Sequence, residues 1–312
     1  MLVTVFLFVA MRLYFLIGMI GMPHTGDETY QYSIVHEGFD IYRGTFMPGI
    51  GYYLSAFYLV LEEITLPDAR VIVGVTNIVL ILIATALVRK TIGPWYAIVF
   101  LAVLACVSEW NIVSFTLWGE HPGSLMLVIN FLSMVWLFHR IVVGQRTSVL
   151  WYPAVAVLFG ASLYVRQNFM VFPVIALILS VIVFTVLYVR DGTWRFNAFV
   201  VPLIYVIGLF ALTPWSMALS NHLGGFRVAP ISQDLSLAIH YGKPRLMPRV
   251  KGVIRERIAA EGKSGGYSER MLKGNTFLVV HRAARIQAET EGRPLLDIYE
   301  EYRRYALEGL TA

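Results

Sequence analysis

The sequence predicts an all-α polytopic membrane protein, because it is far more apolar and far less charged than a soluble domain. Of its 312 residues, 57% are hydrophobic and 14% are charged, whereas about 25% charged residues is usual in soluble proteins. Several runs of about 18 or more residues carry few charges, the length that a helix needs to cross a bilayer. The runs are apolar on every side, without the alternation typical of a transmembrane β-barrel. These features exclude a soluble globular enzyme.

Seven segments are predicted to be transmembrane helices, and one further apolar run is too short to cross. The short run, Ile50–Leu61, ends at Glu62 and Glu63, and its length suits an interfacial or re-entrant helix. The first segment lacks a basic start and a small-residue cleavage site, so we expect a retained helix rather than a signal peptide. The seven segments are 1–21, 70–88, 95–116, 123–143, 149–164, 169–189 and 196–218.

Three short basic loops predict how the chain is oriented. Residues 89–90, 140–146 and 190–195 carry these bases, and they share one side only if residues 48–63 do not cross. Short cytoplasmic loops are enriched in Lys and Arg, so we expect these loops in the cytoplasm. We therefore expect a multi-pass protein of the cell (inner) membrane. The first loop (22–69), the turns 118–122 and 164–168 and the tail then face the extracytoplasmic side.

The composition changes near residue 220 and divides the chain into a transmembrane module, 1–220, and a polar, mostly helical extracytoplasmic tail, 221–312. The tail holds 15 of the 25 Lys and Arg residues and 10 of the 20 acids, so it carries the whole net charge of +5. Acids and bases alternate there, which favours a solvated surface next to membrane lipids over nucleic-acid binding. Two apolar stripes at helical spacing, from Val250 and from Leu295, fit either a membrane surface or packing on the protein's own extracytoplasmic face.

The informative polar residues all fall on the predicted extracytoplasmic side. Asp27 and Glu28 directly follow the first span, and charges near hydrocarbon often mark function. Glu120 and His121 follow a later span and are compatible with a metal site, but their spacing matches no zinc signature, so no metal cofactor is indicated. The alternatives are a solvated loop for the first pair and a polar helix end for the second.

Two arginines complete the set of candidate residues. Arg166 is the one base in its turn, followed by Gln167, and its guanidinium suits phosphate binding. The alternative for Arg166 is an anchor that snorkels to the interface. Arg12 lies near the middle of the first span, where a charge is costly unless it is paired. Arg12 could neutralise a lipid phosphate or pair with a carboxylate, and we expect the structural pairing.

A series of short motifs runs along about residues 1–240, beginning with an Asp-Glu pair and a tyrosine that open the first loop. The segments are, in chain order, Gly26–Tyr30, Met47–Leu54, Ala69–Lys90, Thr116–Leu125, Leu163–Pro173 and Leu212–Ser232. Together these motifs resemble the GT-C glycosyltransferases, most closely the protein O-mannosyltransferase and aminoarabinose transferase branch.

The resemblance implies a transferase that takes a sugar from a polyprenyl-phosphate donor and passes it, with inversion, to a lipid, glycan or protein acceptor on the extracytoplasmic side. Asp27 would be the general base, and Glu28 would position Asp27 or the acceptor. Arg166 would hold the donor phosphate. The remaining substrate-binding candidates are Tyr30, Glu120, His121 and Gln167.

The chain also departs from the family pattern. Phe46 and Met47 replace a basic or His residue, and Gly49 replaces a proline. The family's arginine after the Pro-Trp pair is missing, and residues 216–220 stand in its place. Family members usually continue with more helices and a larger soluble domain, so we expect a truncated or minimal form. Two other functions stay open: a non-catalytic paralogue that binds lipid-linked sugars, and a small membrane transporter. A transporter fits less well, since no inverted repeat is visible.

Overall fold

The computed structural model describes residues 2–23, 28–37, 49–107, 114–117, 119–192, 196–227, 232–261, 272 and 276–308. Every regular element in these ranges is a helix, as the sequence predicts. The described chain forms two compact units that divide between Leu212 and Thr213. The division falls slightly before the composition change near residue 220.

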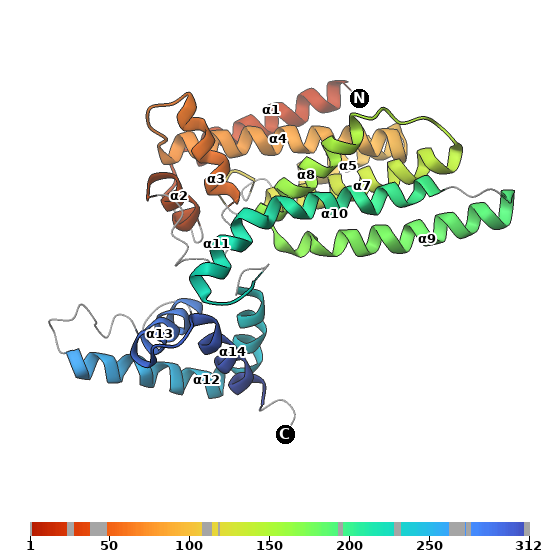
Figure 1. Ribbon diagram of the computed structural model, residues 1–312. Helices are drawn as coiled ribbons and strands as arrows, with labels where there is room; N and C mark the ends of the chain where they lie inside the picture. Colours follow the sequence, from red (N-terminus) through yellow and green to blue (C-terminus); the bar gives the residue numbers. More distant parts are fainter. Residues whose placement is uncertain are drawn as a thin grey trace. The chain divides into compact units, whose positions relative to one another are not determined.

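The first unit is a bundle of long apolar helices with short helices at one end (Figure 1). Its core joins α1, α4, α5 and α7 through buried side chains that include Phe8, Ile81, Leu101 and Ile129. The α-helices are α1 (Leu2–Met19), α2 (Glu28–Glu37), α3 (Gly49–Ser55), α4 (Leu66–Thr91), α5 (Pro94–Cys106), α7 (Glu120–Val143), α8 (Trp151–Val165), α9 (Phe172–Asp191) and α10 (Val200–Leu209). Short 3-10 segments are η2 (Ala56–Leu59), η3 (Gln167–Val171), η4 (Phe196–Phe199) and η5 (Phe210–Leu212).

Local sequence signals explain where the long helices begin and end. Thr65 caps α4: its hydroxyl accepts the backbone N–H of Asp68, whose carboxylate accepts the N–H of Thr65 in return. Helices α7 and α9 end at Gly144 and Gly192, both in the left-handed region with φ of +74° and +64°. Glycine adopts this conformation without a steric cost, so it stops a helix cleanly.

Five segments of the described chain are long and apolar enough to cross a membrane, which suggests a membrane protein. They are Leu2–Met19, Leu66–Thr91, His121–Val143, Phe169–Asp191 and Phe196–Leu223. The other two predicted spans, 95–116 and 149–164, contain the shorter helices α5 and α8, of 13 and 15 residues. At 1.5 Å per residue these two helices reach roughly 20–23 Å, less than the ~30 Å hydrocarbon core.

The ends of the bundle differ in character. Figure 1 shows the C-terminal ends of α4, α7 and α9 and the start of α8 at one end of the first unit, and α2 and α3 at the other. Two of the basic loops and Arg190 of the third thus share an end, while residues 193–195 lie outside the described residues. The predicted short run at 50–61 contains α3, of seven residues, and η2, of four. Neither is long enough to span.

The second unit contains α11 (Thr213–Leu223), α12 (Ser232–Glu261), α13 (Thr276–Glu291) and α14 (Leu295–Leu307). Helices α13 and α14 both pack on α12. The two predicted apolar stripes are buried inside this unit, for example at Val250 and Ile254 on α12 and at Ile298 and Tyr302 on α14. The stripes therefore form a small core of their own.

Candidate functional site

A buried ion pair between Arg70 and Glu28 organises the end of the bundle that carries α2 and α3. Nη2 of Arg70 lies 2.8 Å from Oε2 of Glu28, and Nε lies 3.2 Å from Oε1. Both side chains are 0% exposed. The two parallel bonds form a fork-to-fork pair, which fixes orientation as well as distance. Glu28 is the first residue of α2, where a negative charge also favours the helix dipole.

Arg70 also binds the chain that leaves α1. Its Nη1 donates to the carbonyl of Met19 at 3.1 Å and to that of Met22, and its Nη2 donates to the carbonyl of Pro23 at 2.9 Å. The last carbonyls of a helix have no partner within it, so a guanidinium at this position satisfies them. Arg70 thereby holds the chain on both sides of residues 24–27, which lie outside the described residues.

The segment 114–117 is held against the same pair. The N–H of Leu117 donates to Oε1 of Glu28 at 3.1 Å, and Nδ2 of Asn77 donates to the carbonyl of Ser114 at 2.6 Å. Glu28 thus accepts three hydrogen bonds from within the fold. These bonds fix the start of α2 in place, so Glu28 has a structural role at the residue that follows Asp27 in the sequence.

Arg12 is completely buried, and its contacts belong to the fold. Its Nη1 donates to Oγ of Ser114 at 2.7 Å and its Nη2 to the carbonyl of Leu104 at 3.1 Å. The guanidinium also lies over the ring of Phe8, 5.1 Å from its centre. Arg12 therefore pairs within the fold, as expected, but these partners are oxygens of α5 and of segment 114–117 and an aromatic face of α1, whereas a carboxylate was predicted.

Arg166 lies against the start of α7, at Gly123. A Cβ atom added to Gly123 would come within 2.7 Å of Cγ of Arg166, so the missing side chain leaves room for the arginine stem. A Cβ on Gly119 would lie 3.4 Å from the carbonyl oxygen of Val165. His121, between these two glycines, is 3% exposed. The structure therefore brings the turns 119–123 and 164–166 together, although they are distant in sequence.

Helix α3 packs on the same turn of α8. The carbonyl of Tyr164 lies directly against the α-carbon of Gly49, where no side chain fits. The ring of Tyr52 meets the ring of Tyr164 edge-on, with 6.3 Å between centres. Burial raises the pKa of the Tyr52 hydroxyl, and the neighbouring Tyr164 raises it further. Gln31 of α2 accepts the N–H of Gly51 at 2.9 Å, so α2, α3 and α8 form one packed unit.

Four of the predicted site residues are not described in full. Asp27 lies outside the described residues, as do the side chains of Tyr30, Glu120 and Gln167. The backbones of the last three belong to α2, α7 and η3, the elements that meet at this end. Among the residues described, no three His, Cys, Asp or Glu side chains group as metal ligands would.

The sequence predicts no role for Arg70 or Asn77 in the site. Arg70 is the first residue of a predicted span and belongs to the segment Ala69–Lys90 that carries the family resemblance. A signal was present: Arg70 and Asn77 are seven residues apart, two helical turns, so they share one face of an otherwise apolar helix. A polar stripe on such a helix indicates polar partners inside the bundle.

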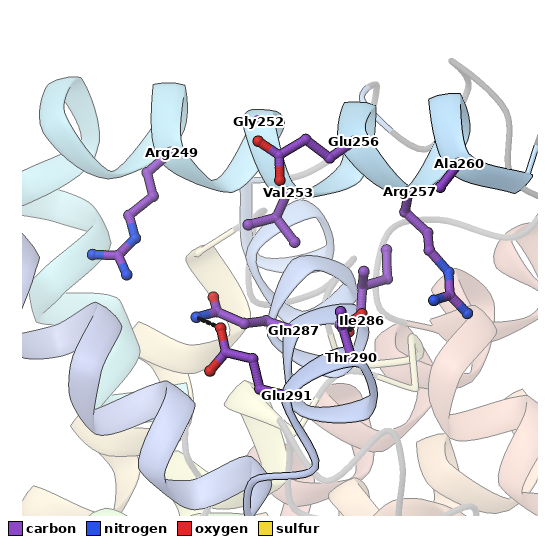
Figure 2. Close-up of a pocket in the computed structure, with 10 residues that line it drawn as sticks. All are labelled: Arg249, Gly252, Val253, Glu256, Arg257, Ala260, Ile286, Gln287, Thr290 and Glu291. Atoms are coloured by element: carbon purple, nitrogen blue, oxygen red, sulfur yellow. Dashed lines mark hydrogen bonds between the residues drawn. The ribbon is translucent and has the colours of Figure 1, made fainter.

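The second unit contains a separate hollow of about 530 Å³ between α12 and α13 (Figure 2). Arg249 and Arg257 flank it, and Glu256 and Glu291 face it. Arg249 pairs with Glu301, and Gln287 binds Glu291 at 2.7 Å. The hollow combines both signs of charge, part of which are already paired, and no single ligand class matches it.

Comparison with known proteins gave no match to this chain among family models, curated proteins or solved structures.

Proposed function

We propose that this chain is a membrane glycosyltransferase that moves a sugar from a polyprenyl-phosphate donor to an extracytoplasmic acceptor. The observation that supports the proposal is the packing of the aliphatic stem of Arg166 against Gly123, in the turn that also contains Glu120 and His121. The Glu28 carboxylate, bonded to Leu117, fixes the residue after Asp27 near the same turn. The residue after the base candidate, the phosphate-binding candidate and the sugar-binding candidates thus belong to segments that contact one another.

The chemistry requires only these groups and no nucleotide-binding fold. The acceptor hydroxyl oxygen attacks the anomeric carbon, the bond from that carbon to the phosphate oxygen breaks, and its electron pair leaves on the phosphate. Asp27 would take the hydroxyl proton, and a partly desolvated carboxylate has a raised pKa that suits this step. Arg166 would bind the leaving phosphate in a two-pronged manner.

The proposal also includes an orientation of the chain in the membrane. We place the basic end of the bundle in the cytoplasm and the end with α2 and α3 outside. This gives seven crossings if α5 and α8 are completed by neighbouring residues. A donor whose polyprenyl chain lies in the bilayer would then meet the acceptor at the outer interface.

Donor binding by three proteins tests the role of Arg166. Affinity for a panel of polyprenyl-phosphate-linked hexoses and pentoses would be measured for the wild type, Arg166→Lys and Arg166→Ala. Lys is a point charge without the planar fork, so a phosphate clamp predicts a graded loss with Lys in between. Equal affinity in all three would leave Arg166 an interface anchor, since Lys snorkels as well as Arg. Arg89→Ala, an exposed base at the other end, is the matched control.

A further inference from the structure

A second ligand site is suggested by an apolar groove near the basic end of the first unit. The groove has a volume of about 290 Å³ and lies between α4, α7 and α8. Its walls include Leu87, Ile129, Val155 and Leu158, and its polar lining is limited to Lys90 and Ser133. The volume is at the lower end of the range for small-molecule sites.

Two indole rings with a cation next to each lie at the basic end of this groove, which Lys90 and Trp151 themselves line. The amine of Lys90 lies 5.8 Å from the ring centre of Trp151, which meets the ring of Trp136 at 5.1 Å. The guanidinium of Arg140 lies over the ring of Trp136, 5.4 Å from its centre. Cation–π contacts hold such charges in place, and tryptophan is the residue that favours the level of lipid headgroups.

We propose that this groove binds an anionic diacyl phospholipid. One acyl chain would lie along the apolar walls, and the phosphate would lie at Lys90. The wide exposure of Ile83 and Trp151 at the rim opens the groove toward the bilayer rather than into the bundle. Apolar walls that end in a cation match an amphiphile with a negative head, and basic pockets between membrane helices bind such heads. This inference does not depend on the glycosyltransferase proposal.

The test compares lipid retention by the full chain in mixed micelles of phosphatidylglycerol and phosphatidylcholine, using native mass spectrometry. The wild type should retain phosphatidylglycerol in preference. Lys90→Gln should reduce that preference about fivefold, the effect expected of one surface base on anionic lipid. Arg89→Gln removes the same charge from the neighbouring exposed position, which does not line the groove, and should change little.

A second pair of variants tests the groove without changing charge. Ala154 and Ala161 are both exposed on α8, but only Ala154 lines the groove. Ala154→Phe should abolish retention of the lipid, and Ala161→Phe should preserve it, with melting temperatures confirming that both fold. The proposal is overturned if the wild type shows no preference, if Arg89→Gln equals Lys90→Gln, or if Ala154→Phe retains the lipid.

Discussion

The Arg70–Glu28 pair should be a major source of stability at the α2 end of the bundle. Glu28→Gln keeps the shape of the side chain and removes its charge, which leaves the guanidinium of Arg70 buried without its anion. Both side chains are 0% exposed, so solvent cannot replace the lost partner. Breaking such a buried pair costs about 3–5 kcal/mol.

The three hydrogen bonds to Glu28 agree with this magnitude. They come from Nε and Nη2 of Arg70 and from the N–H of Leu117, at 3.2, 2.8 and 3.1 Å. A hydrogen bond to a charged group contributes about 1.5–3 kcal/mol, and a Gln side chain retains part of this. Arg70→Met should cost a similar amount. The double variant should lose clearly less than the sum of both, because no isolated charge stays buried.

The free energy of unfolding of the full chain in mixed micelles, followed by tryptophan fluorescence, measures these effects. Glu62→Gln changes an exposed carboxylate near the same end and should stay within about 0.5 kcal/mol of the wild type. A Glu28→Gln protein as stable as the wild type would show that the charge of Glu28 does not stabilise this end of the bundle. Strict additivity in the double variant would show that the two side chains do not act as a pair.

Three further predictions concern packing and topology. Gly123→Ala should push Arg166 aside and weaken donor binding while the chain still folds, whereas Gly18→Ala, with no atom within 4 Å of the new Cβ, should have no effect on binding. Gly208→Ala should lower the free energy of unfolding by about 1–3 kcal/mol, because the new Cβ would lie 2.6 Å from a ring atom of α8 and 2.9 Å from a carbonyl there. Ser55→Cys, in a chain whose native cysteine is replaced, should react with a membrane-impermeant thiol reagent on intact cells, and labelling only after lysis would contradict the proposed orientation.

Much of the helical organisation could be predicted from apolar runs alone. Five of the seven predicted spans correspond to helices long enough to cross, since length and hydropathy are local properties. The shortness of α5 and α8 was not predicted. An apolar run continues past the point where the helix stops, and composition alone does not mark the stop at residue 106 or the start at residue 151.

The sequence proposes candidate site residues but does not show their contacts. Because the three short basic loops must share one side of the membrane, the sequence predicts that the first loop and the turns at 118–122 and 164–168 share the other side. The pairing of Glu28 with Arg70 joins residues 42 positions apart, and the contact of Arg166 with Gly123 depends on a missing side chain. The spacing of Arg70 and Asn77 indicates a polar partner for Arg70 but does not identify it, and no pattern indicates the contact of Arg166 with Gly123, so only the packed helices reveal these partners. For the same reason, the sequence could not show that the carboxylate of Glu28 is hydrogen-bonded to Arg70 and Leu117.

Sugar loss from a polyprenyl-phosphate donor tests the central proposal most directly. The purified full chain would be incubated with the donor panel and an acceptor mixture, and free polyprenyl phosphate would be measured. We expect turnover by the wild type and a loss of about 10²–10⁴-fold in Asp27→Asn. Turnover should be unchanged in Asp191→Asn, which makes the same substitution on α9, where Asp191 pairs with Arg190. Release that is equal in Asp27→Asn and the wild type, or no release from any donor, would contradict it.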